Sequence, residues 1–309
     1  LGATFTDEGG AAPNATKTLH SSFGEGSFVN AGTYNRNGLG TTLVFGLDNT
    51  GTININSGTL RFSNSGQSSG TINVASGARL FLDSANSTAP MKGTLSGQII
   101  NAGAVELGRG TFRMAADLSI NGEVKLIGDG SLVNDSTNTL TSLTVAGGSL
   151  SGNGHLTTGT LQFSAGALGS AFNPYTTGTT TVTGPAVFNG RANLAVNYGH
   201  TLTLLGTSTW TQGGGSLGSA VFGGAIVNGA GAHFTDEGAL ASNNYKELRR
   251  DAVGGGGTFT NLGTYTRSGL GTTRAYGFDN RGLLAIEAGT VRVDGAFRNT
   301  GTVYLANGS

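Results

Sequence analysis

The 309-residue sequence contains no cysteine, only four prolines and few charged side chains, which make up 11% of the chain. Without cysteine, the chain has neither a disulfide framework nor a thiolate metal site. The 17 basic and 17 acidic residues cancel to a formal net charge of zero. The basic surface that is typical of proteins binding nucleic acid or anionic membranes is therefore not expected.

Long hydrophobic runs are missing as well. Uninterrupted apolar stretches are only a few residues long, far short of the roughly 20 residues of a membrane-spanning helix, and we expect no transmembrane segment. The sequence starts at Leu1 and shows no secretion signal, so we expect it to be a piece of a longer polypeptide.

Glycine, in contrast, is abundant, with 56 residues. It does not follow the three-residue period of collagen. A hydrophobic content of 37% and a net charge of zero are also unlike a disordered chain. The sequence therefore predicts a folded chain in which many positions need glycine.

A short repeat of about 19 residues runs through the sequence. The segment GTININSGTLRF from Gly51 is followed by GTINVASGARLF from Gly70. The same spacing separates Gly103, Gly122 and Thr141, and later Gly263, Gly282 and Gly301. Apolar residues alternate in each copy, as in Ile53 and Ile55 or Ile72 and Val74, and this period of two predicts β-strands with one inward face.

Two short strands per copy cannot bury their apolar faces alone, whereas stacked copies can pair each strand with its equivalents. The sequence therefore predicts an all-β fold, a right-handed parallel β-helix (a β-solenoid) with coils of about 19 residues. The alternative is a β-sandwich or barrel of short strands. Four segments are expected to leave the coils, and the last is expected to be a charged protrusion or a helical turn: residues 16–26, 86–93, 169–178 and 243–257.

A second, longer repeat connects the two ends of the chain. The segment GATFTDEG at residues 2–9 returns as GAHFTDEG at residues 231–238. Residues 28–61 match residues 259–292 at 19 of 34 positions. We expect one continuous segment, 1–309, in which residues 1–230 are a first long unit and residues 231–309 begin a second.

Acidic and imidazole side chains give no clear constellation for catalysis, and we expect no enzyme, cofactor or metal. Glycoside hydrolysis needs two carboxyl groups about 5–10 Å apart, and adjacent copies show no aligned pair. The duplicated residues Asp48 and Asp279 are expected in turns. The pairs Asp7–Glu8 and Asp236–Glu237 supply too few oxygens for Ca²⁺. The histidines are expected at the surface: His20, His155, His200 and His233.

Two kinds of binding surface remain open. The first is a flat column of threonines, as on an ice-binding face. Its members follow the leading glycine of several copies: Thr33, Thr52, Thr71 and Thr302. It breaks at other copies: Ala104, Glu123, Ser142 and Leu283. A carbohydrate surface would instead use exposed aromatic side chains, for which the candidates are Tyr34, Tyr265, Tyr276 and Trp210.

The register of GTININSGTL, with linking phrases such as FVNAGTY, FTNLGTY, FDNRG and FRNTGTV, resembles the repeats of large bacterial extracellular β-solenoid proteins. These include filamentous-haemagglutinin-like adhesins and autotransporter passengers. The resemblance covers nearly all of the chain and implies secretion to the cell surface or the extracellular space. It implies no particular ligand.

From this resemblance we expect a rod segment of a surface fibre, adhesin or matrix filament. Its partners would be further copies or the continuation of the same chain, end to end, and a host-surface or glycan ligand. The alternative is a β-helix protein that binds or degrades polysaccharide.

Overall fold

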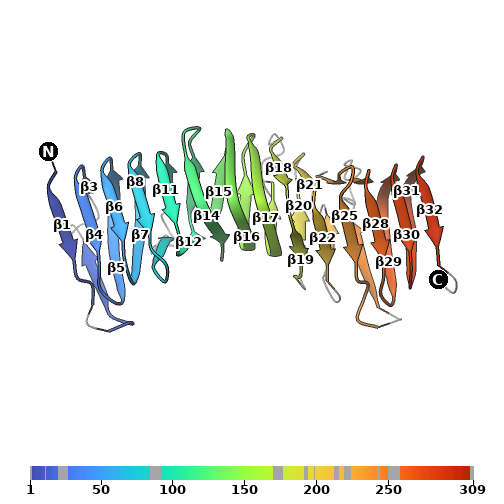
Figure 1. The fold of residues 1–309 in the computed structure, drawn as a ribbon, viewed down its shortest axis with the longest axis horizontal. Helices are drawn as coiled ribbons and strands as arrows, with labels where there is room; N and C mark the ends of the chain where they lie inside the picture. The colour runs from blue at the N-terminus through green and yellow to red at the C-terminus, as the bar shows by residue number, and fades with distance from the viewer. Residues whose placement is uncertain are drawn as a thin grey trace. The chain divides into compact units, whose positions relative to one another are not determined.

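The computed structural model describes residues 2–10, 12–19, 27–83, 92–169, 177–190, 194–197, 199–211, 216–218, 224–241, 244–249 and 258–306. These residues form 32 β-strands and no helix, which confirms the prediction of an all-β chain (Figure 1). None of them belongs to a helix that could cross a membrane. The chain divides into two units, Leu1–Leu143 and Thr144–Ser309, and β16 (Thr137–Ser151) contains the boundary.

In the first unit the strands form three parallel ladders. The first ladder contains β1 (Thr4–Asp7), β4 (Thr33–Arg36), β6 (Thr52–Ile55), β8 (Thr71–Val74), β11 (Gln98–Asn101) and the start of β14 (Ser119–Leu126). The second contains β2 (Thr16–Leu19), the first parts of β5 (Thr41–Asn49) and β7 (Thr59–Ser68), β9 (Arg79–Asp83), β12 (Ala104–Arg109) and the end of β14. The third contains β3 (Phe28–Asn30), the last parts of β5 and β7, β10 (Lys92–Leu95), β13 (Thr111–Met114) and β15 (Ser131–Asn134).

The second unit also has three parallel ladders, numbered here to match. The first contains the middle of β17 (His155–Leu168), β19 (Ala186–Phe188), β22 (Thr207–Trp210), β25 (His233–Asp236), β28 (Thr264–Arg267), β30 (Leu283–Ile286) and β32 (Thr302–Leu305). The second contains the end of β17, β20 (Leu194–Val196), β23 (Leu217–Gly218), β26 (Tyr245–Arg249) and the first parts of β29 (Thr272–Asn280) and β31 (Thr290–Asn299). The third contains the start of β17, β18 (Thr179–Val182), β21 (Thr201–Leu204), β24 (Ala225–Asn228), β27 (Thr258–Asn261) and the last parts of β29 and β31.

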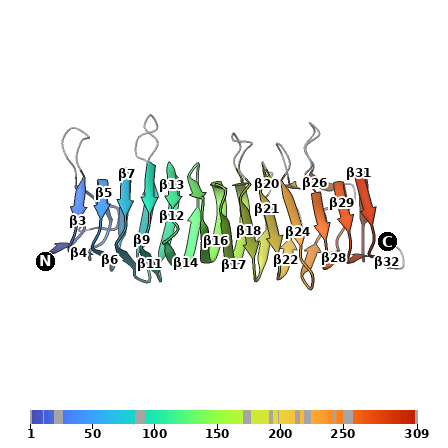
Figure 2. The ribbon, with the colours of Figure 1, turned by 90° about the horizontal axis from the view of Figure 1, so that it is seen from above.

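The core of each unit is made by the residues that the period of two places on the inner face. Ile53, Ile55 and Ile72 are fully buried, and the outward residues Asn54 and Asn73 that alternate with them are only partly covered. Figure 2 shows β3, β5 and β7 side by side in one unit, and β26, β29 and β31 side by side in the other. The described strands pair with one another in parallel, which is unlike the antiparallel sheets of a β-sandwich.

A third strand position in each repeat is the main difference from the sequence-based expectation of two. The phrases FVNAGTY and FDNRG, which look like links between strands, contain strands of the third ladder. Asn30 ends β3 and Asn49 ends β5. Both are buried, and Asn30 Nδ2 donates to Asn49 Oδ1 at 2.7 Å. Asparagine is typical of turns, but here the side chain of Asn30 bonds to the equivalent side chain in the next strand.

The repeats also shift between ladders. The strands that follow Gly51 and Gly70 lie in the first ladder, whereas the strand that follows Gly103 lies in the second, paired with β9. The pattern of alternating apolar residues suits each ladder equally, so sequence register alone does not reveal the shift. The column of Thr33, Thr52 and Thr71 therefore continues at Gln98 and not at Ala104.

The four segments that were expected to leave the coils lie only partly outside the ladders. Residues 16–19 form β2 and residues 245–249 form β26, which pairs with β29 and is no helical turn. The apolar side chain of Leu248 faces the core, and this explains the strand. Residues 20–26, 86–91, 170–176 and 250–257 lie outside the described residues.

Close backbone approach explains several of the glycines. A Cβ atom at Gly38 would lie 1.5 Å from the carbonyl oxygen of Glu8, and one at Gly269 would lie 1.7 Å from that of Glu237. A side chain at either position would force the adjacent strands apart, because real Cβ contacts are much longer.

Candidate functional site

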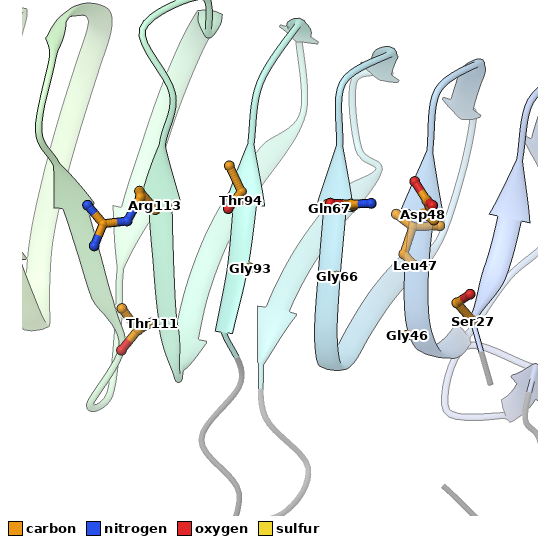
Figure 3. Close-up of a pocket in the computed structure, with 10 residues that line it drawn as sticks. All are labelled: Ser27, Gly46, Leu47, Asp48, Gly66, Gln67, Gly93, Thr94, Thr111 and Arg113. Atoms are coloured by element: carbon orange, nitrogen blue, oxygen red, sulfur yellow. The ribbon is translucent and has the colours of Figure 1, made fainter. Parts of the chain in front are cut away.

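A hollow of about 620 Å³ lies on the outer face of the third ladder in the first unit (Figure 3). Four polar residues follow one another along it in strand register: Asp48 of β5, Gln67 of β7, Thr94 of β10 and Arg113 of β13. The remaining lining residues are Ser27, Gly46, Leu47, Gly66, Gly93 and Thr111.

Two glycines occupy neighbouring places in the ladder beside the hollow. Gly66 pairs with Leu47 on one side and with Gly93 on the other. Both glycines lie on the inner face of the ladder, in line with the buried side chains of Leu47 and Phe112. Gly46, with a φ of 62°, lies where the register between β5 and β7 shifts, which bends β5 beside the hollow.

The side chains along the hollow can form hydrogen bonds with a polar ligand. The carboxylate of Asp48 lies on β5 and the guanidinium of Arg113 on β13, with the amide of Gln67 and the hydroxyl of Thr94 between them. Arg113 also forms an ion pair with Asp135. Asp48 is the one carboxylate among the described lining residues, whereas glycoside hydrolysis uses two.

A buried ionic cluster surrounds the first acidic residue of each FTDEG segment. Asp7 Oδ1 accepts from the backbone N–H of Gly9 at 2.8 Å, and Asp7 Oδ2 accepts from the Tyr34 hydroxyl at 2.9 Å and from Thr42. The Arg36 side chain is fully buried, with Nε 3.5 Å from Asp7 Oδ2. Its outer nitrogens donate to backbone carbonyls of the adjacent turn: Gly38, Leu39 and Gly40.

The second long repeat contains the same cluster, but its lysine, Lys246, is buried, whereas the equivalent Lys17 beside Asp7 is 50% exposed. Asp236 accepts from Tyr265, Thr273 and the backbone of Gly238. Lys246 Nζ donates to Asp236 Oδ1 at 2.9 Å. It also donates to the carbonyl oxygens of Trp210 and Thr211 at 3.0 Å, and it lies 3.8 Å from the centre of the Trp210 ring.

The pKa directions follow from these contacts. Burial by itself would raise the pKa of Asp7, but the hydrogen bonds from Thr42, Gly9 and Tyr34 outweigh it and the pKa is lowered. Burial and the charge of Asp7 raise the pKa of Tyr34 well above its usual range. Burial lowers the pKa of Lys246, and Asp236 offsets part of this effect. In each copy the aspartate serves as an internal counter-ion.

The acidic residues expected in turns lie in strands. Asp48 is in β5, opposite Val29 and Gln67, and Asp279 is in β29 and accepts from Arg281. The alternation of the strand points both side chains outward, while the following asparagines point inward. Glu8 is exposed, unlike the Asp7 that precedes it.

Three of the four aromatic residues proposed for sugar binding are core residues. Tyr34, Tyr265 and Trp210 are at most 1% exposed, so their rings cannot stack on a ligand. Tyr276 is partly covered and donates to Glu247 at 3.4 Å. Tyr34 lies opposite Ile53 and Tyr265 opposite Leu284, both buried, so an aromatic side chain in this position belongs to the core.

The histidines differ from one another. His233 is exposed, His155 is partly covered and contacts Thr179, and His20 lies outside the described residues. His200, expected at the surface, is buried, and its Nε2 lies 2.9 Å from the Thr180 hydroxyl. Gly169 and Gly178 leave the space for it, since a Cβ at either would lie 3.0 or 3.3 Å from His200 atoms. Burial lowers the pKa of His200 to about 4.

The sequence-based interpretation missed the buried cations. Arg36 and Arg267 occupy matching places in the long repeat, as do Tyr34 and Tyr265. The signal in the sequence for these buried cations was an arginine that recurs at an inward position of the strand pattern. Among the described residues, no group of three or more histidines, aspartates and glutamates could hold a metal ion.

Comparisons of the chain with protein-family models, with curated proteins and with solved structures found no match.

Proposed function

We propose that each unit is a right-handed parallel β-helix with coils of about 19 residues, and that the chain is a structural segment of an exported bacterial surface fibre, adhesin or matrix filament. The observation that carries this proposal is the order of the strands. Successive segments enter the first, second and third ladders in turn, as β4, the first part of β5 and its last part do before β6.

In this proposal the function is mechanical. Each coil forms backbone hydrogen bonds with the next coil and packs a layer of apolar side chains against it. The buried clusters around Asp7 and Asp236 and the asparagines of the third ladder add polar contacts between coils. Such a segment gives reach and stiffness without a cofactor. Secretion is supported by the resemblance of the repeat phrases to those of exported β-solenoid proteins.

Antibody labelling of intact cells that produce the chain tests this function. We expect label on the surface of unpermeabilised cells or in the surrounding matrix, with a cytoplasmic protein as the negative control. Label that appears only after permeabilisation would overturn the proposal. The intact mass of the native polypeptide, purified without protease, then shows whether this segment belongs to a much longer fibre protein.

A second candidate function, polysaccharide binding or degradation, is favoured by the polar hollow along Asp48, Gln67, Thr94 and Arg113. A polymer lying along the ladder would meet a hydrogen-bonding side chain from each strand, at intervals of about 4.8 Å.

A panel of polysaccharides tests this candidate. If it is correct, Gln67→Ala and Arg113→Ala will each weaken binding about tenfold, and Asp48→Asn will abolish any turnover. The matched control is Gln98→Ala, which removes an exposed glutamine from the first ladder. Equal binding by all variants, or no binding to the panel, excludes this function.

A further inference from the structure

The hollow on the third ladder of the first unit contains a carboxylate without a partner. Asp48 lines this hollow from β5. None of the described residues donates a hydrogen bond to its carboxylate or forms an ion pair with it. Arg113, the cation among the described lining residues, lies three strands further along the ladder and is paired with Asp135. Asp48 therefore gives the hollow a negative charge that a ligand can compensate.

The second long repeat contains the same aspartate with its charge compensated. Asp279 Oδ2 accepts from Arg281 Nη2 at 2.6 Å and from Arg281 Nε at 2.9 Å. These hydrogen bonds, with the charges of Arg281 and Arg298, lower the pKa of Asp279. In the first repeat Thr50 takes the place of Arg281, and Gln67 takes the place of Arg298. Two neutral residues thus replace two cations beside the aspartate of the hollow.

We infer that the hollow binds a polysaccharide of amino sugars with free amines, and that a protonated amine of this polymer pairs with Asp48. The inference deepens the second candidate function, polysaccharide binding, and rests on it. A charge-assisted hydrogen bond between an ammonium group and a carboxylate is about twice as strong as a neutral one. A neutral polysaccharide would leave the carboxylate without a counter-ion, and an acidic one would be repelled by it.

The other polar side chains of the hollow suit the rest of such a polymer (Figure 3). Gln67, Thr94 and Arg113 follow Asp48 in strand register. With strands about 4.8 Å apart, the row is about 14 Å long. The amide of Gln67 and the hydroxyl of Thr94 both donate and accept, as sugar hydroxyls do, whereas the guanidinium of Arg113 only donates. An N-acetyl carbonyl oxygen on a neighbouring sugar is a suitable acceptor for Arg113.

A basic peptide matches this hollow less well than an amino sugar does. A peptide that binds as an added strand needs a free sheet edge, but β5, β7, β10 and β13 each pair with a strand on both sides. A peptide that binds as a helix needs an apolar groove. Leu47, the large apolar residue among the described lining residues, is only 4% exposed. These features favour a ligand rich in hydroxyl groups.

Two oligosaccharides of equal length test the role of the amine. One is a pentamer of β-linked glucosamine, and the other is its fully N-acetylated form. Calorimetric titration of the whole chain, under conditions that keep the amines protonated, should show the glucosamine pentamer binding about tenfold more tightly. Added salt should reduce this difference, because it screens the charges. Equal affinities, or tighter binding of the N-acetylated pentamer, overturn the inference.

A matched pair of variants tests the role of Asp48. Asp48→Asn removes the charge and keeps the shape of the side chain. We expect it to lower the affinity for the glucosamine pentamer about tenfold and to leave the affinity for the N-acetylated pentamer unchanged. The control is Asp279→Asn, which makes the same change where Arg281 already pairs with the carboxylate. Equal losses in the two variants, or no loss in Asp48→Asn, contradict the inference.

The second long repeat also supplies a variant that leaves every lining residue in place. Thr50→Arg introduces the arginine that compensates Asp279, and the exposed position of Thr50 accommodates a long side chain. The new arginine should pair with Asp48 and weaken binding of the glucosamine pentamer as much as Asp48→Asn does. Thr50→Gln, which adds length without charge, should retain the affinity of the parent. Unchanged affinity in Thr50→Arg, with an unchanged midpoint of thermal unfolding, overturns the inference.

Failure of this inference is distinguishable from failure of the candidate function. Equal binding of neutral and amino polysaccharides excludes the pairing with Asp48 and leaves polysaccharide binding standing. Absence of binding to every polysaccharide excludes both. A pentamer of lysine that binds more tightly than the glucosamine pentamer, and that Asp48→Asn weakens, identifies a basic peptide as the ligand and overturns the inference. Surface labelling of cells is independent of all these results.

Discussion

Residues with buried charge are concentrated at two equivalent places in this chain. Asp7 and Arg36, and Asp236 and Arg267, are each buried as pairs with hydrogen bonds from neighbouring side chains and backbone. A buried charge is costly unless it is paired and its remaining hydrogen-bonding groups are satisfied. The clusters meet this condition, and removing one partner should therefore cost more than removing a surface charge.

Replacing Asp236 should be strongly destabilising. Asp236→Ala leaves Arg267 and Lys246 buried without their counter-ion, and we expect a loss of about 3–5 kcal/mol in the free energy of unfolding. The matched control is Asp48→Ala, a partly exposed aspartate in a strand, for which we expect a change within about 0.5 kcal/mol. Denaturant titration measures both, and equal losses would show that the cluster has no special role.

His200 should make stability fall in mild acid. Its pKa is lowered to about 4 in the folded chain from about 6.5 in the unfolded chain. The unfolded state therefore binds the proton first, and stability present above pH 6.5 is lost as the pH falls to about 4. The loss should reach about 3 kcal/mol.

The variant His200→Gln tests this pH dependence by thermal unfolding between pH 4 and 7. We expect His200→Gln to flatten the profile, because glutamine does not titrate. The exposed His233 provides the control, and His233→Gln should leave the profile of the parent unchanged. If the profile of His200→Gln also matches that of the parent, the assignment of this pH dependence to His200 is wrong.

At the scale of the element, asparagine columns of different burial run along two ladders. Asn228, Asn261 and Asn280 lie inside the third ladder, and Asn261 Nδ2 also donates to the carbonyl oxygen of Leu283. On the outer face of the first ladder Asn73 donates to Asn54 and Asn54 to Asn35, in the opposite direction along the chain. The side-chain geometry is similar, but only the outer column has access to water.

The two columns should respond differently to the same substitution. Asn261→Ala orphans buried groups of its neighbours, and we expect a loss of about 1–3 kcal/mol for each group. Asn54→Ala exposes the equivalent groups to water and should cost less than about 1 kcal/mol. The midpoints of urea unfolding compare them. A loss for Asn54→Ala as large as that for Asn261→Ala would show that burial does not set the cost.

At the scale of the whole molecule, the ladders should tolerate loss of one complete repeat. Deletion of residues 51–69 joins Thr50 to Gly70 and removes 19 residues, so that β8 can pair with β4 in the register β6 now has. We expect a cooperative thermal transition to remain. Deletion of residues 51–60 removes β6 from the first ladder and the first two residues of β7 from the second, leaves the rest of the repeat, and should abolish the transition of the first unit. Circular dichroism follows both, and similar loss in the two variants would contradict the modular repeat.

Much of the fold could be predicted from local patterns. Ile53, Ile55, Ile72 and Val74 are buried as the period of two predicts, because alternation records which face of a strand meets the core. The third ladder was not predicted, since Asn30 and Asn49 resemble turn residues when read alone. The burial of Tyr34 and Trp210 was not predicted either, because inward and outward aromatic residues look alike in a sequence.

The sequence by itself determined the class of structure, the inward face of most strands and the recurrence of the long repeat, because these depend on spacing along a single strand. Only the tertiary structure decided which ladder each strand joins, since this depends on the corners between strands. It also decided that Lys246 meets Asp236 and Trp210, and that Asp48 and Gln67 line one hollow. Those contacts join residues that lie between 10 and 36 positions apart, a distance at which no local pattern identifies a partner.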